Sequence, residues 1–126
     1  MENELQNLPK AMAALDHSID IEKQSIAIAT TELRTLETRN KTLDGEITSL
    51  GEQIVRQKNK QLEVKKNEEY QALENEIANL ASKVNEKEDE QIEVLIKIDD
   101  ARQTAKIAEE KITLRVIDLE KQRVEL

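Results

Sequence analysis

Apolar residues recur along the first half of the chain with the alternating three- and four-residue spacing of a heptad repeat. With Leu5 at an a position, thirteen of the sixteen a and d positions are apolar: Leu5, Leu8, Met12, Leu15, Ile19, Glu22, Ile26, Ala29, Leu33, Leu36, Asn40, Leu43, Ile47, Leu50, Ile54 and Gln57. The stripe of an ordinary surface helix drifts, whereas a sustained seven-residue repeat winds helices into a left-handed supercoil. The pattern therefore predicts a long helix packed against a partner helix.

A second heptad block follows, out of phase with the first. Its a and d positions are Tyr70, Leu73, Ile77, Leu80, Val84, Lys87, Gln91, Val94, Ile98, Ala101, Ala105, Ala108, Ile112, Arg115, Leu119, Gln122 and Leu126. The two frames differ by two residues, and continuous coiled coils absorb slips of three or four residues. The chain is therefore expected to break within residues 56–69, near its midpoint, so that two arms of equal length pair in antiparallel fashion.

The predicted fold is all-α, a long antiparallel two-helix coiled-coil hairpin. It forms a single domain over residues 1–126, with arm one at about 8–62, the tip at about 63–68 and arm two at about 68–126. Pro9 is tolerated in a first helical turn, which predicts that the regular helix starts near it. Asn67 is a plausible cap for arm two. Gly45 and Gly51 weaken arm one and make it a candidate bend.

Three positions of the predicted seam carry polar side chains at one level: Asn40, Lys87 and Gln91. A turn near residues 63–67 allows two registers that differ by one heptad, and both bring Asn40 close to Lys87 and Gln91. Buried polar residues in coiled coils fix register at a cost in stability. We expect that role here, with a functional hinge as the alternative.

Composition supports a helical chain without an ordinary globular core. Hydrophobic and charged residues each make up 37% of the sequence, aromatic residues 1%, and cysteine is absent. Disulfides and thiolate metal sites are thereby excluded. The amino-terminal residues lack the features of a signal peptide, and no uncharged apolar run approaches the roughly 20 residues that span a bilayer. A cytoplasmic protein with no membrane partner is expected.

Nothing in the sequence predicts catalysis. The single histidine, His17, falls on an outward-facing heptad position without a second ligand type beside it. There is no glycine-rich phosphate loop and no nucleophile motif. Acid–base catalysis needs a concave, desolvated setting that two helices do not supply. We expect no enzymatic activity, no catalytic or metal-binding residue and no cofactor in this chain.

The predicted tip carries a local excess of positive charge on an acidic protein. Residues 56–66 hold five basic side chains and one acidic one, although the whole chain has a net charge of −8. The candidate contact residues at the tip are Arg56, Lys58, Lys60, Lys65, Lys66 and Tyr70. This segment is suited to a nucleic-acid backbone or an acidic protein surface. The alternative is that the cations complement the helix dipole at the end of arm one.

A second candidate surface consists of aliphatic residues outside the seam. Four c positions, which antiparallel pairing places on one side, carry Ile21, Ile28, Ile107 and Leu114. The neighbouring g positions hold Ser18, Ser25 and Thr104, which are small. This aliphatic face is a candidate docking surface for a helix or a domain, and self-association into a homodimer is its simplest use. Exposed aliphatic residues are also common on soluble proteins, so chance is the alternative.

Residues 64–77 read V-K-K-N-E-E-Y-Q-A-L-E-N-E-I. This motif resembles the hallmark of a bacterial family in which a long helical hairpin precedes a four-cysteine zinc ribbon. The acidic and aliphatic residues 87–96 are similar to the continuation of that family, and Pro9 matches a proline of its first helix. The resemblance covers most of the chain, and only the motif at 64–77 is specific.

The resemblance implies that the motif lies at the hairpin tip and that the protein is a chaperone-like or nucleic-acid-binding adaptor. Similar proteins support flagellar or type III secretion or hold an alternative sigma factor, so such proteins are the implied partners. Zinc is implied only for a ribbon, and no cysteine follows here. Because residues 119–126 are still in heptad phase, we expect either a helix cut from a longer protein or a relative without the ribbon.

The sequence thus favours a non-enzymatic protein-interaction adaptor, the helical part of a zinc-ribbon regulatory protein. One alternative is a nucleic-acid-binding arm that uses the basic tip. A second alternative is a purely structural rod, formed by a parallel dimer of unbroken helices, although the shift between the two heptad frames speaks against it.

Overall fold

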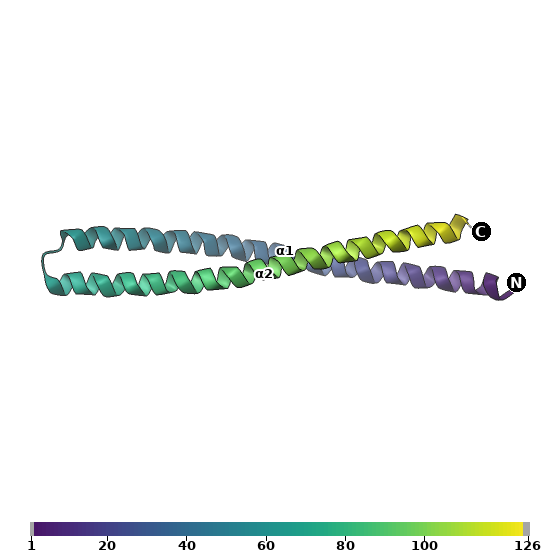
Figure 1. Ribbon diagram of the computed structural model, residues 1–126, viewed down its shortest axis with the longest axis horizontal. Helices are drawn as coiled ribbons and strands as arrows, with labels where there is room; N and C mark the ends of the chain where they lie inside the picture. Colours follow the sequence, from purple (N-terminus) through teal and green to yellow (C-terminus); the bar gives the residue numbers. More distant parts are fainter. Residues whose placement is uncertain (1, 125–126) are drawn as a thin grey trace. The chain divides into compact units, whose positions relative to one another are not determined.

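The computed structural model describes the backbone of residues 2–124 and the side chains of residues 7–122, and this part of the chain is almost entirely helical. Helix α1 spans Glu2–Glu63 and helix α2 spans Asn67–Val124 (Figure 1). The two helices pack against each other in antiparallel fashion, and no strand occurs among the described residues. The predicted all-α helical hairpin is confirmed.

The helices are separated by residues 64–66 alone. The Val64 amide still donates to the Lys60 carbonyl at 3.2 Å, and the Tyr70 amide donates to the Lys66 carbonyl at 3.1 Å. The cap position of α2 therefore falls on Lys66, and Asn67, expected to be the cap, is the first helical residue. The unbroken helices that the parallel-dimer alternative requires are absent at this point.

The expected start of arm one near residue 8 is wrong, because α1 begins at Glu2 and contains Pro9 in its interior. Proline removes one backbone donor and crowds the preceding turn, but its fixed φ is close to the helical value. The prediction relied on the preference of proline for a first turn, and that preference does not prevent a helix from extending through a proline.

The described residues form two compact units. One unit, Thr35–Lys97, contains the connection and the adjoining halves of both helices. Its buried apolar residues are Leu43, Leu80 and Val94, and Leu43 has no exposed surface. Every described a and d position in this unit is buried or half-buried except Tyr70. The heptad frame read from the sequence is therefore the packing frame of this unit.

The other unit joins the part of α1 up to Arg34 to the part of α2 from Ile98 onward. Its buried residues are Ile19, Ala29, Ile98, Ala101, Ala108 and Leu119. Three of these six residues are alanines, so each contributes less buried apolar area than a leucine or isoleucine would. The described a and d positions of this unit are all buried or half-buried.

Helix α1 continues through both of its glycines, neither of which has a positive φ. A Cβ added at Gly45 would meet nothing within 4 Å. Replacing Gly45 with alanine is therefore expected to raise the free energy of unfolding by about 0.8 to 1 kcal/mol, through helix propensity alone. Urea unfolding followed by circular dichroism checks this value. A loss of stability would mean that Gly45 serves a contact or a bend.

Candidate interaction surfaces

The polar seam residues lie in the unit formed by Thr35–Lys97, and the structure brings two of the three together. The Gln91 side-chain amide donates to Asn40 Oδ1 at 3.0 Å and also to the Asp44 carboxylate. Because these two acceptors are one helical turn apart on α1, Gln91 lies at the level of Leu43. This position selects one of the two registers, since the other would set Gln91 at the level of Leu36.

Lys87, the third polar seam residue, reaches past the seam to a carboxylate on its edge. Its ammonium lies 2.9 Å from Glu46 Oε2. On the same helices, Arg39 Nε and Nη2 both donate to Glu90 Oε1, at 2.9 and 2.6 Å. Neither Glu46 nor Glu90 was identified from the sequence. Both residues occupy g positions of the heptad repeat, next to the seam, where charged side chains often pair across helices. These positions could have predicted the two ion pairs.

The ion pair affects the titration of Glu46. The hydrogen bond from Lys87 lowers the pKa of this carboxyl below its ordinary value of 4.5. Partial burial opposes that shift, whereas the positive charges of Lys87 and Arg39 act in the same direction as the hydrogen bond. Glu46 is therefore ionised at neutral pH and binds across the helices as an anion.

This shift predicts a pH dependence of stability. Since folding lowers the pKa of Glu46, its ionised form stabilises the fold above pH 4.5, and this contribution is lost as the pH falls below that value. Glu46→Gln should therefore lower the melting temperature at pH 7 and have a smaller effect at about pH 3. Thermal unfolding of both proteins at the two pH values tests this, with Glu52→Gln on the same helix as control. Equal effects of Glu46→Gln at both values would contradict it.

A charged pair within the seam of the other unit was not predicted from the sequence. Arg115 Nη1 donates to Glu22 Oε1 at 2.9 Å, and the two side chains are 30% and 14% exposed. Both residues occupy d positions, so each would be an isolated charge in the seam without the other. The pair could have been predicted from the sequence, because these two seam positions, one on each arm, carry opposite charges.

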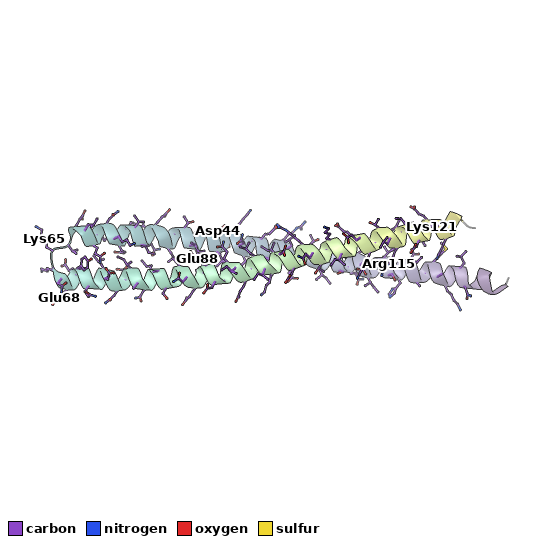
Figure 2. All side chains as sticks on the ribbon, viewed as in Figure 1. Asp44, Lys65, Glu68, Glu88, Arg115 and Lys121 are labelled. Carbon is purple, nitrogen blue, oxygen red and sulfur yellow. The ribbon has the colours of Figure 1, made fainter. Side chains whose placement is uncertain are left out.

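At the connection, all six candidate contact residues are exposed, and Tyr70 is 45% exposed. Lys65 lies within the connection and Glu68 in the first turn of α2 (Figure 2). Glutamates of α2 lie along this part of α1, because Gln57 donates to Glu76 at 3.2 Å and Gln61 donates to Glu74. Residues 56–76 contain five basic and five acidic side chains, so their net charge is zero. The positive charge predicted for the tip therefore lies beside an equal number of acidic side chains from the two helices.

The aliphatic face lies in the unit that contains the part of α1 up to Arg34 and the part of α2 from Ile98. All four members are exposed: Ile21 by 50%, Ile28 by 68%, Ile107 by 52% and Leu114 by 64%. An open groove between the helices follows g and c positions further along the same side. The groove is lined by Ala11, Ala14, Leu15, Ser18, Asp118, Lys121 and Gln122. Aliphatic side chains from both helices and a groove with small residues therefore adjoin on one side of this unit.

The remaining features concern metals and membranes. His17 is exposed, and no group of three or more histidine, aspartate or glutamate side chains suited to a metal ion occurs among the described residues. Neither helix, over its described length, combines the length and apolarity needed to cross a bilayer.

No protein-family model, no curated protein and no solved structure matches this chain.

Proposed function

We propose that this chain is a non-enzymatic protein-interaction module that acts as an adaptor or a chaperone-like protein. The observation that carries the proposal is the aliphatic face, where four large aliphatic side chains from two helices are each at least half exposed. Single exposed aliphatic residues are ordinary, whereas a cluster beside a groove is typical of a surface that a partner covers. The partner is a protein that presents an apolar helix or strip to this face.

The proposal is non-catalytic because, over the described residues, no polar or charged side chain is buried. Acid–base or nucleophilic catalysis relies on groups held in a desolvated pocket. The charged side chains of the Arg39–Glu90 and Lys87–Glu46 pairs are instead partly exposed and bond to each other across the helices. Their arrangement holds the helices in register.

The resemblance to the zinc-ribbon hairpin family adds a class of partner to the proposal. The motif at residues 64–77 covers the connection and the first turns of α2, where the resemblance places it. This agreement supports an adaptor related to that family, with a sigma factor or a flagellar or type III secretion component as partner. In such a protein zinc would belong to a ribbon and to no residue described here.

Photo-cross-linking tests the proposal. A benzophenone amino acid at Ile28 should capture one protein of discrete mass in the cells that produce this chain, and the same group at His17 should not. Both positions are exposed on the same part of α1. Changing Ile21 and Leu114 to serine should abolish the capture at Ile28. Equal capture at both positions, or capture insensitive to the serine changes, would contradict a specific aliphatic docking site.

The nucleic-acid alternative has a separate test. Phosphate binding by a basic segment releases counterions and falls steeply with salt. The zero net charge of residues 56–76 predicts negligible RNA binding even at low salt. Fluorescence anisotropy with a labelled single-stranded RNA checks this. Salt-sensitive binding that is lost when Lys58 and Lys60 become glutamate would favour a nucleic-acid-binding arm over the docking module.

A further inference from the structure

Helix α1 carries a second seven-residue pattern on a side that the seam and the aliphatic face do not use. Within the unit formed by Thr35–Lys97, the e positions of α1 are Glu37, Asp44, Gly51 and Lys58, and Lys65 follows at the same spacing in the connection beyond the end of the helix. The pattern runs acidic, acidic, glycine, basic, basic, so its charge changes sign at Gly51. Asp44 and Lys65, which precede and follow Gly51 in the sequence, are labelled in Figure 2. All five residues belong to the unit formed by Thr35–Lys97.

The hairpin itself does not require a glycine at residue 51. Gly51 has no positive φ, and an added Cβ would meet nothing within 4 Å. Glycine nevertheless weakens a helix interior. Its missing side chain leaves an open hollow on the surface, lined by Thr48, Gly51, Glu52, Val55 and Arg56. The small residue thus creates room on the outside of the hairpin.

Helix α2 also carries small side chains at the level of Gly51. Gln57 bonds to Glu76 and Glu46 pairs with Lys87, so the stretch of α2 between residues 76 and 87 runs alongside Gly51. Ala78 and Ala81 occur in this stretch, and both are exposed. A third helix could therefore approach the backbone of the hairpin closely at this level.

We propose that a second copy of this chain docks here, with the two α1 helices crossing in antiparallel fashion at Gly51. Asp44 and Lys58 are equally distant from Gly51 along α1, so each Asp44 meets Lys58 of the other copy. Thr48 and Val55, three and four residues from Gly51, lie close to the centre of this crossing. A two-fold interface must be complementary to itself, and this pattern satisfies that condition in both directions.

The charge pattern selects this occupant over others. A parallel second copy would place Asp44 against Asp44 and Lys58 against Lys58, which repel. A uniformly acidic or basic partner would match only one half of the pattern. Asp44 and Lys58 are exposed, as is Val55, at 57%. Asp44 also accepts the hydrogen bond from Gln91, which holds its carboxylate on the hairpin.

Sedimentation equilibrium with charge-reversal variants tests the interface. The unmodified chain should form dimers, and Lys58→Glu or Asp44→Lys should each weaken self-association about tenfold or more, because each creates two like-charge contacts. An equimolar mixture of the two variants should restore dimers as heterodimers, since every contact is then between opposite charges. Raising the salt concentration should weaken the association.

Two matched controls separate this interface from general effects. Lys60→Glu makes the same charge change two residues away, off the pattern, and should leave dimerisation unchanged. Gly51→Gln should block the close approach, whereas Gly45→Gln, which also enters open space on α1, should not. Circular dichroism shows whether each variant keeps its helices. Asp44→Lys also removes the hydrogen bond from Gln91, which can reduce the helical content. If it does, Lys58→Glu and Gly51→Gln still test the interface.

Three results would overturn the proposal. The first is a single chain at every concentration, and the second is a dimer that charge reversal and Gly51→Gln leave intact. The third is a dimer that Ile28→Ser abolishes, because the copies would then meet through the aliphatic face. The proposal goes beyond the proposed function and uses a different side of α1, so the photo-cross-linking test can succeed or fail independently of it.

Discussion

Replacing Leu43 with aspartate is expected to lower the free energy of unfolding by at least about 3 kcal/mol and to reduce the helical content. Leu43 has no exposed surface and is the largest fully buried side chain among the described residues. Removing a buried leucine costs about 2 to 5 kcal/mol, and a carboxylate in its place adds a cost of desolvation, because the nearby ammonium of Lys87 is already paired with Glu46. Urea unfolding followed by circular dichroism measures the loss.

Leu62→Asp is the matched control for this change. Leu62 lies on the same helix and in the same unit, but it is 86% exposed. Its replacement should change the free energy of unfolding by no more than about 0.5 kcal/mol. If both variants were equally stable, Leu43 would not lie in the packed seam and the heptad frame of α1 would be wrong.

The second large effect concerns the charged pair in the seam of the other unit. Glu22→Leu should destabilise the protein by about 1 to 3 kcal/mol, because Arg115 would keep its charge in the seam without an anionic partner. Leucine at both positions should restore the stability of the unmodified chain or exceed it, since packed aliphatic residues often replace an ion pair without loss. Thermal unfolding of the four proteins of this double-mutant cycle provides the comparison.

The contrary result is equally specific. If both single variants and the double variant lost stability additively, Glu22 and Arg115 would not interact in the fold. The pair could also fix the alignment of the helices rather than add stability. In that case the double variant would be stable but would unfold less cooperatively than the unmodified chain.

Much of the fold follows from the sequence because the heptad is a local pattern. Leu36, Leu43 and Leu50 recur at the spacing that buries one side of a helix, and the structure buries or half-buries all three. The break between the helices was also predictable, because a shift of two residues between frames has no helical solution. The predicted start of the first helix near Pro9 was wrong, because the preference of proline for a first helical turn does not fix where a helix begins.

The candidate surfaces were less predictable, since each depends on side chains that are distant in sequence. The basic residues at 56–66 are a local feature, but Glu74 and Glu76 join them only when α2 folds back. Lys87 was expected near Asn40, yet its ammonium pairs with Glu46. Long charged side chains reach beyond their own heptad position, so the backbone pattern does not fix their partners.

The sequence by itself determined the helices, the seam and the place of the turn, because periodicity and propensity act over a few helical turns. Only the tertiary structure decided the register, through the bonds of Gln91 to Asn40 and Asp44. Two registers satisfy the same apolar pattern, since shifting one helix by a heptad again places seam residues against seam residues. The polar contacts differ between them, and they form only when the two helices are side by side.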